Sequence, residues 1–250
     1  MSISKSQIKL ITSLQQKKYR LKESLFVVEG IKVVDEFLKS DFELNSLFCT
    51  EDVKECYFGS NPEIITEIEL KKISGLKSPN KVLALFKIPK ETRIDQLLGL
   101  KVMLDDINDP GNLGTIIRLC DWFGVKEIIC SKNTVDCYNS KVVQSTMGSL
   151  TRVNIKYVDL MSYIEQTSQP LFIADMEGEN VYNSKLPSDG IVIMGNEANG
   201  VSNDIKKIVT HKLTIPRYGE IQATESLNVA TATAILLNEF RRNIFIEKLS

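Results

Sequence analysis

The sequence predicts an α/β protein in two parts: a small N-terminal α/β domain, residues 1–92, and a parallel-sheet α/β domain, residues 98–250. Short apolar runs bounded by turn residues alternate with helical patterns, which is typical of a parallel sheet covered by helices on both faces. A polar stretch, Pro89 to Gln96, separates the two parts. With 250 residues, 43% of them apolar, the chain is long enough to build a core in each part.

The opening segment is strongly basic. Six lysines and arginines face a single acid before position 25, and apolar residues recur at helical spacing, so we expect an amphipathic helix. Its cationic end, around Lys17, Lys18 and Arg20, has two interpretations: a solvated helix face, or a surface that contacts the phosphate backbone of RNA. A helix is expected after the first of three strands, and the strands are expected over Leu25–Gly30, Leu44–Thr50 and Lys81–Pro89.

The second part has a more regular alternation of strands and helices. Five apolar runs predict strands, and the segments between them have helical periodicity. The chain is expected to end in a long helix from Ser226, whose wide apolar stripe packs on the core or on a partner subunit. The predicted strands are Leu100–Ile107, Glu127–Ser131, Leu171–Asp175, Ile191–Gly195 and Lys212–Pro216, and the predicted helices between them include Thr115–Phe123, Asn139–Gly148 and Ser202–Val209.

The composition excludes several classes of function. The net charge of −1 is not that of a polycationic protein or of a chain with a long acidic tail. No stretch approaches the roughly 18 apolar residues of a membrane helix, and the opening lacks a signal-peptide layout, so we expect a cytoplasmic protein without a membrane partner. The five cysteines form no C-x-x-C pair and predict reduced, mostly buried thiols. A single histidine, His211, excludes zinc sites with several imidazoles, and we expect it to be structural.

Three loops at predicted strand ends gather asparagine, glycine and glutamate. In an open α/β sheet, ligands bind beyond the carboxyl ends of the strands, so these loops form a candidate site. The first loop follows the strand that ends at Ile107. It combines a turn at Asp109 with Asn112 and Gly114, and a helix follows with Arg118 in its opening turns. The alternative for this loop alone is a structural turn with an ion-paired surface arginine.

The second loop, Gly195 to Ser202, has the spacing G-x-x-x-x-G. It lacks the Lys-Ser or Lys-Thr of a P-loop, and it is not the G-x-G-x-x-G of a dinucleotide site. Its glycines allow the backbone to approach a ligand or to adopt a positive φ, and Glu197 between them can accept hydrogen bonds. A plain glycine turn is the alternative.

The third loop, Ile215 to Ala232, leads into the final helix. Ser226 is a good N-cap for that helix, and Asn228, one residue inside it, has an amide that can serve a neighbouring loop. The plain alternatives are capping alone for Ser226 and a satisfied polar group for Asn228. Each loop is weak evidence by itself, but three of them at strand ends in one domain predict a ligand site.

Together the three loops resemble the ordered motifs of the SpoU family, the TrmH-type RNA ribose 2′-O-methyltransferases of the SPOUT superfamily. The motifs are N-x-G-x-x-x-R from Asn112, M-G-N-E-x-x-G-V from Met194, and I-P-x-x-G with S-L-N-V between Ile215 and Val229. Their order and spacing make the resemblance specific over roughly residues 98–246. The first ninety residues are similar to the substrate-binding module that precedes this domain in the family, although Ser78–Lys81 departs from the usual Pro-Gln-Gly.

The resemblance implies a catalytic domain tied in a deep trefoil knot and a homodimer with the C-terminal helix at its interface. It implies S-adenosyl-L-methionine as methyl donor, held by backbone groups of the second and third loops, and no metal. The implied substrate is a ribose 2′-hydroxyl in structured RNA. Ribosomal RNA is the first expectation; a tRNA substrate and a non-catalytic RNA-binding or ribosome-assembly role are the alternatives. Cofactor contacts are expected at Gly195, Ile215 and Leu227, with Met194 and Pro216 nearby.

The family assigns the arginine that matches Arg118 to activation of the hydroxyl. Because a normal guanidinium keeps its proton at neutral pH, we expect Arg118 to bind phosphate and the 2′-oxygen and to stabilise developing negative charge, with a base role as the alternative. Asn112 is expected to orient the arginine or the ribose, and Glu197 to pair with Arg118 or with the nucleotide. Ser226 and Asn228 are expected to fix the third loop and the substrate.

The third loop departs from the family pattern. Between Gly219 and Ser226 the sequence inserts EIQATE, which is longer than the connection typical of the motif, so the resemblance does not give the conformation of Tyr218–Glu225. Arg217 stands where an apolar residue is common and can add a phosphate contact.

Overall fold

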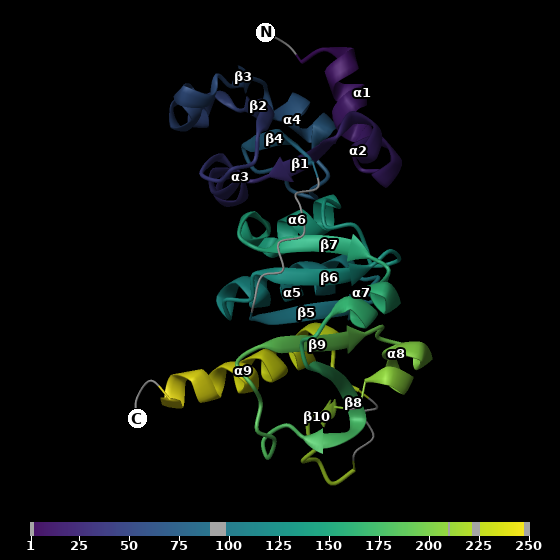
Figure 1. Cartoon of the computed structure of the whole chain (residues 1–250). Helices are drawn as coiled ribbons and strands as arrows, with labels where there is room; N and C mark the ends of the chain where they lie inside the picture. The colour runs from purple at the N-terminus through teal and green to yellow at the C-terminus, as the bar shows by residue number, and fades with distance from the viewer. Residues whose placement is uncertain (1–2, 91–98, 210, 222–225, 248–250) are drawn as a thin grey trace. The chain divides into compact units, whose positions relative to one another are not determined.

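The computed structural model describes residues 3–90, 99–209, 211–221 and 226–247, with the side chains of the last segment described as far as Arg242. The chain forms two compact units. Unit 1 holds the described residues before position 91 together with Asp136–Thr151, and unit 2 holds the described residues from position 99 to Val135 and from Arg152 onward. Figure 1 labels the elements of both units along the chain.

Unit 1 is a four-stranded sheet with helices on both faces. Its elements are α1 (Lys5–Ser13), α2 (Lys17–Glu23), β1 (Leu25–Glu29), α3 (Ile31–Leu38), β2 (Leu44–Cys49), the 3₁₀ helix η1 (Glu51–Ser60), β3 (Glu63–Ile64), α4 (Glu67–Ile73), β4 (Val82–Lys87), α6 (Ser140–Thr146) and the 3₁₀ turn η2 (Ser149–Thr151). The strand order is β1-β4-β2-β3, antiparallel except for the β2–β3 pair. Leu83 and Leu85 of β4 pack in one core cluster with residues of α1 and α4, whereas Phe86 lies against Phe37 of α3.

The three strands predicted in this part are confirmed, but the opening helix is not continuous. It is divided into α1 and α2, because Gln16 adopts an extended conformation between them. Arg20 stabilises the break: its Nη1 donates to the carbonyl oxygens of Leu14 and Gln15 at 2.8 and 3.0 Å, which are groups that a helix end leaves without partners.

Residues 136–151 complete unit 1, although they follow the second predicted strand of the parallel-sheet part. The Tyr138 ring packs against Phe26 with ring centroids 4.7 Å apart. Asp136 Oδ2 accepts hydrogen bonds from Nε and Nη2 of Arg20 at 2.9 and 2.5 Å. Ser140 Oγ donates to Gln15 Oε1 at 2.7 Å, so this segment is attached to the junction of the two opening helices.

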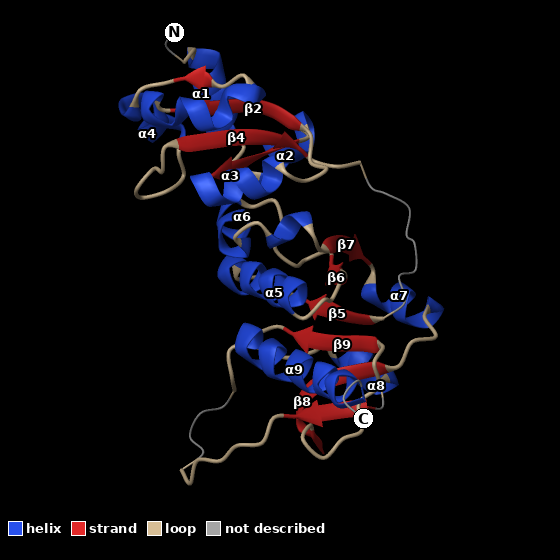
Figure 2. Cartoon of the chain, turned by 90° about the vertical axis from the view of Figure 1, so that its left-hand side faces the viewer, coloured by secondary structure: helices blue, strands red, loops and turns tan. Residues whose placement is uncertain are grey.

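Unit 2 is a six-stranded parallel sheet in the order β10-β8-β9-β5-β6-β7. Its elements are β5 (Leu100–Asp105), α5 (Pro110–Trp122), β6 (Glu127–Ser131), β7 (Asn154–Val158), α7 (Leu160–Gln166), β8 (Leu171–Asn180), β9 (Gly190–Gly195), α8 (Asn203–Ile208), β10 (His211–Thr214) and α9 (Val229–Glu247). Figure 2 shows α5 and α9 on one face of the sheet and α7 and α8 on the other. Ile191 and Ile193 of β9 pack in one cluster with α7 and α8 residues, whereas Phe172 of β8 contacts Phe240 of α9.

The predicted fold class is therefore confirmed, with corrections to individual elements. All five predicted strands form; β7 was not predicted, because its side chains are only partly buried and its sequence has no continuous apolar run. The helix expected from Thr115 begins at Pro110, where Asp109 caps it and proline occupies the first turn. In the part of the chain that the structure describes, none of the helices has the length and apolar character of a membrane span.

Buried charges lie at the amino edge of the parallel sheet. Glu127, which begins β6, is 1% exposed and pairs with Lys101 Nζ at 3.2 Å and with Lys156 Nζ at 2.7 Å. Lys101 Nζ also donates to the Tyr163 hydroxyl at 3.1 Å. Burial alone would lower the pKa of Lys101, but the Tyr163 hydrogen bond and the charge of Glu127 outweigh it and hold that pKa above its ordinary value.

Candidate active site at the carboxyl edge of the parallel sheet

The carboxyl ends of β5 and β9 lie side by side, since Asp105 is the register partner of Gly195. The first predicted loop leaves β5 at this point and the second leaves β9. The loops that carry the first two motifs therefore start from adjacent strands, at the edge where parallel α/β sheets bind ligands.

The second loop is a closed turn built around Asn196. Asn196 and Gly200 exchange two backbone hydrogen bonds, of 3.0 and 2.8 Å. The Asn196 Oδ1 accepts from the backbone N–H groups of Ala198 and Asn199, at 2.9 and 3.2 Å. A Cβ at Gly195 would lie 2.1 Å from backbone atoms of Gly200 and Val201, so glycine is required there by the fold of the loop itself.

Both ends of this loop are attached to the end of β5. Asn196 Nδ2 donates to the carbonyl oxygen of Asp106 at 2.8 Å. On the other side of the loop, the Ser202 N–H donates to Asp105 Oδ2 at 2.7 Å. Asn196 and Asp105 were not predicted as site residues; the signal that could have found Asn196 is its place between Gly195 and Glu197 in the second motif.

Three predicted site residues are joined in one chain of hydrogen bonds. Asn112 Nδ2 donates to Glu197 Oε1 at 2.7 Å, and Asn228 Nδ2 donates to Asn112 Oδ1 at 2.9 Å. The amide of Asn112 thus uses its donor toward the second loop and its acceptor toward the third. Side chains separated by 85 and 116 positions in the sequence meet through it, so the structure brings the three predicted loops together.

Asn228, not Ser226, caps the final helix. The Asn228 Oδ1 accepts from the backbone N–H groups of Ala230 and Thr231, at 2.9 and 3.3 Å, and its carbonyl accepts the first helical bond from Ala232. The helix starts at Val229, three residues later than predicted, which corrects the N-cap prediction for Ser226. Ser226 is exposed in the segment before the helix, and residues 222–225 of the inserted loop lie outside the described residues.

Arg118 lies in the second half of α5, not in its opening turns, because the helix begins earlier than predicted. Its side chain is exposed. Among the described residues it forms no ion pair with Glu197, whose carboxylate instead accepts from Asn112. Gly114 stands one turn before Arg118 in the same helix.

The predicted cofactor residues lie at the carboxyl edge or next to it. Met194 is 2% exposed and ends β9 together with Gly195, whereas Ile215 and Pro216 are half-buried just after β10. Leu227 is 49% exposed immediately before the α9 cap. In the described part of the chain, no group of three or more His, Cys, Asp or Glu side chains is arranged to hold a metal ion.

An ion pair lies on the α8 side of this edge. Lys206 Nζ, on α8, lies 3.3 Å from Asp175 Oδ2, on β8. Burial would raise the pKa of Asp175, but a backbone hydrogen bond from Glu177 and the charge of Lys206 hold it below its ordinary value. Asp175 is therefore an ionised partner of Lys206 at neutral pH.

Of the three predicted RNA contacts, two are on the surface of unit 1 and one is not. Lys17 and Lys18 are exposed, and Lys18 Nζ lies 4.8 Å from the centroid of the Tyr19 ring. Arg20 is 2% exposed and its guanidinium is bonded to Asp136 and to two backbone carbonyls. The prediction for Arg20 is corrected: its hydrogen-bonding groups are committed inside unit 1 and do not face a nucleic acid.

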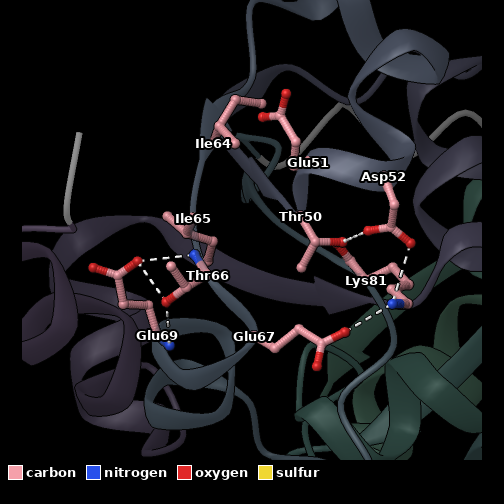
Figure 3. Close-up of a pocket in the computed structure, with 9 residues that line it drawn as sticks. All are labelled: Thr50, Glu51, Asp52, Ile64, Ile65, Thr66, Glu67, Glu69 and Lys81. Atoms are coloured by element: carbon pink, nitrogen blue, oxygen red, sulfur yellow. Dashed lines mark hydrogen bonds and ion pairs between the residues drawn. The ribbon is translucent and has the colours of Figure 1, made fainter.

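Unit 1 also contains a hollow of about 1010 Å³ with an acidic lining (Figure 3). Lys81 lies in it, 3.1 Å from Asp52 and 2.9 Å from Glu67. Lys81 has a φ of +56°, a conformation that favours glycine, and it ends the segment that departs from the family's Pro-Gln-Gly. The two carboxylates thus hold the ammonium group of a lysine whose backbone conformation favours glycine.

Comparison with known proteins agrees with this geometry. Residues 99–238 match the SpoU rRNA Methylase family, and residues 5–84 match the MRM3-like substrate binding domain. The 23S rRNA (guanosine(2553)-2′-O)-methyltransferase RlmP of Bacillus subtilis (strain 168) is 28% identical over 255 residues, which cover 96% of this chain and 98% of that protein.

Two solved structures extend the similarity to the whole chain. A TrmH-family protein from Porphyromonas gingivalis is 35% identical with a TM-score of 0.85, and the match covers 96% of this chain and 99% of that one. The AdoMet-bound rRNA methyltransferase from Sinorhizobium meliloti is 26% identical with a TM-score of 0.85, covering 98% of both chains. The predicted resemblance is confirmed, and the chain belongs to the SpoU rRNA methylase family.

Proposed function

We propose that this protein transfers a methyl group from S-adenosyl-L-methionine to a ribose 2′-hydroxyl of ribosomal RNA. The observation that carries the proposal is the hydrogen-bonded chain Glu197–Asn112–Asn228, which joins all three motif loops at the carboxyl edge of the sheet. The family match and the 23S rRNA 2′-O-methyltransferase activity named for the Bacillus subtilis relative support it. The AdoMet-bound Sinorhizobium meliloti structure supports the choice of donor.

The residues at the carboxyl edge fit such a donor. A nucleoside sulfonium requires apolar contacts and backbone hydrogen-bond partners. Tyr218 and Leu227 are large side chains that are 81% and 49% exposed there, and the backbone of Tyr218 and Gly219 makes no backbone hydrogen bond within the described residues. Met194, Gly195, Ile215, Pro216 and Leu227 would hold the donor. When bound, it supplies a methyl group already activated for transfer.

The chain's own residues then orient the acceptor and stabilise charge. Arg118 binds the substrate phosphate and the 2′-oxygen, and its exposed cation stabilises the negative charge that develops as the hydroxyl reacts. Asn112 bonds both Glu197 and Asn228, so that the three side chains surround the ribose. Ser226, in the same loop as Asn228, contributes to the substrate surface.

Three further properties belong to the proposal. We assign the protein to the cytoplasm. We also propose that unit 2 contains a trefoil knot. β10 lies at the end of the sheet, next to β8, whereas Asn228, fourteen positions after Thr214, bonds Asn112 in the helix that follows β5. The chain therefore passes back across the sheet after β10. We assign a homodimer, because Trp122 is 85% exposed on α5, the helix that packs beside α9. Burial of such a side chain is typical of an interface.

Methyl transfer from labelled donor to RNA tests the activity directly. Wild-type protein should label ribosomal RNA transcripts, and mapping of 2′-O-methyl positions in cells with and without the gene should show one ribose that depends on it. Preferential labelling of tRNA would replace the substrate. Donor binding without any transfer would favour a non-catalytic RNA-binding role, and failure to bind the donor by calorimetry would overturn the proposal.

RNA binding by unit 1 is tested by neutralising Lys17 and Lys18 together, as Lys17→Gln and Lys18→Gln. We expect weaker RNA binding and a salt dependence that is shallower by about one to two phosphate contacts. The control is Lys87→Gln, a half-exposed lysine paired with Glu43 at the end of β4. If affinity and salt slope stay those of the wild type, the α2 lysines form only a solvated face.

A further inference from the structure

The position of Glu197 depends on the conformation of its loop, which the Glu197 side chain does not stabilise by itself. Glu197 is exposed and lies between Asn196 and Ala198 at the tip of the turn. Its bond to the half-buried Asn112 is exposed to solvent, and an exposed hydrogen bond of this kind has little stabilising effect by itself. Something else must fix the loop for the 2.7 Å distance to be maintained.

The two ends of the loop are fixed by residues that carry no role in the proposed chemistry. On one side, Asn196 uses its whole amide: Nδ2 donates to the Asp106 carbonyl, and Oδ1 accepts from two N–H groups inside the turn. On the other side, Asp105 is 9% exposed and accepts from the Ser202 N–H at 2.7 Å. A carboxylate that accepts a backbone N–H makes a strong, charge-assisted hydrogen bond.

Both attachments end on the same short segment of chain. Asp105 is the last residue of β5, and Asp106 follows it with a φ of +63°. The Asp106 N–H is itself held by Ser131 Oγ at 3.0 Å, so this segment is anchored to β6. Three residues further on, Asp109 caps α5 and accepts from the N–H of Asn112 at 2.8 Å. One anchored segment thus leads directly to Asn112 and holds the loop of Glu197.

We infer that Asn196 and Asp105 are positioning residues for the methyl transfer: they hold the Glu197 loop against the end of β5 and so set Glu197 on Asn112. This rests on the proposed function, in which Glu197 and Asn112 surround the reacting ribose. Neither residue needs to touch the substrate, because a small displacement of the loop is sufficient to misplace a group that must be aligned for transfer.

The test compares turnover with donor binding in the full-length protein. Asn196→Ala should lower kcat about tenfold while the affinity for S-adenosyl-L-methionine in calorimetry changes less. Asn199→Ala is the matched control, since it removes an exposed amide of the same turn that makes only a 3.4 Å contact; it should retain wild-type turnover. Asp105→Ala should lower kcat like Asn196→Ala, and Asp105→Asn, which keeps an acceptor oxygen, should recover most of the loss.

A double-mutant cycle separates positioning from general destabilisation. If Asn196 acts through Glu197, then Asn196→Ala should have almost no further effect on kcat in a Glu197→Ala background, whereas destabilisation would lower activity equally in both backgrounds. Additive effects, or wild-type turnover by both Asn196→Ala and Asp105→Ala, would overturn the inference. A wild-type protein with no methyl transfer at all would instead overturn the proposed function. If Asn196→Ala does not fold, the comparison of Asp105→Ala with Asp105→Asn decides.

Discussion

The two edges of the parallel sheet in unit 2 hold polar side chains in opposite ways. At the amino edge, Lys101 and Glu127 are buried, Lys156 is partly buried, and the three charges are paired with one another, as an interior charge must be. At the carboxyl edge, Glu197 and Asn228 are exposed, and among the described residues the amide of Asn112 joins them. The amino edge uses polar groups to stabilise the sheet, and the carboxyl edge leaves them accessible to a ligand.

The largest expected effect concerns the amino edge. Glu127→Gln leaves two lysine ammonium groups without their shared counter-charge, and we expect a loss of about 3 kcal/mol or more in the free energy of unfolding. Because the pKa of Lys101 is raised in the folded state, its contribution is present below its ordinary value of 10.5 and is lost as the pH rises through the raised value. Denaturant unfolding at pH 7 and at alkaline pH measures both.

The control for this change is Asp204→Asn, which breaks the exposed pair with Lys207 and should leave the unfolding midpoint nearly unchanged. If the Glu127→Gln protein were as stable as the Asp204→Asn protein, the charges at the amino edge would not stabilise the sheet, and the proposed difference between the two edges would be wrong. In the folded Glu127→Gln protein, donor affinity should be close to that of the wild type, because the mutation lies at the opposite edge from the loops.

The next effect concerns the carboxyl edge. Arg118→Ala should retain donor binding and lose about a hundredfold or more in methyl transfer, or ~2.7 kcal/mol of transition-state stabilisation, without a matching loss of stability. Single-turnover kinetics and calorimetry measure the two quantities. Lys126→Ala, an exposed cation just before β6 at the amino edge, serves as control and should turn over normally. Undiminished transfer by Arg118→Ala would exclude this residue from the mechanism.

The smallest effect separates two roles of one residue. Asn228 caps α9 with its Oδ1 and bonds Asn112 with its Nδ2. Asn228→Asp keeps the capping oxygen and should preserve stability, yet turnover should fall several-fold because the bond to Asn112 is lost. Asn228→Ala should lose turnover and, in addition, about 1 kcal/mol of stability. Equal stability of the two variants would show that the cap contributes nothing.

Much of the sheet could be predicted from sequence because its strands are buried on both faces and therefore form continuous apolar runs, as Ile191–Gly195 does. Helix starts were less predictable. The run Asp109-Pro110-Gly111 was interpreted as a turn, although aspartate before proline is also a cap followed by a favoured first-turn residue. At α9, Ser226 and Asn228 are both good caps, and sequence alone does not distinguish them.

The site was predictable through its motifs, but its bonding was not. Asn112, Glu197 and Asn228 were selected individually, and the structure supplies the order in which they bond. Arg20 shows the limit most clearly: its partner Asp136 is 116 positions away, so local sequence presents it as one more surface cation. Long-range pairs of this kind leave no periodic signal along the chain.

That same pair has a consequence for how the protein can be divided. Asp136 and Tyr138 pack in unit 1, but β5, α5 and β6 separate them from the rest of that unit in the sequence. The N-terminal ninety residues are therefore not a complete folding unit by themselves. An excised fragment would carry a buried guanidinium without its carboxylate and an aromatic cluster lacking one ring. Grafting this module onto another methylase would therefore require the later segment as well.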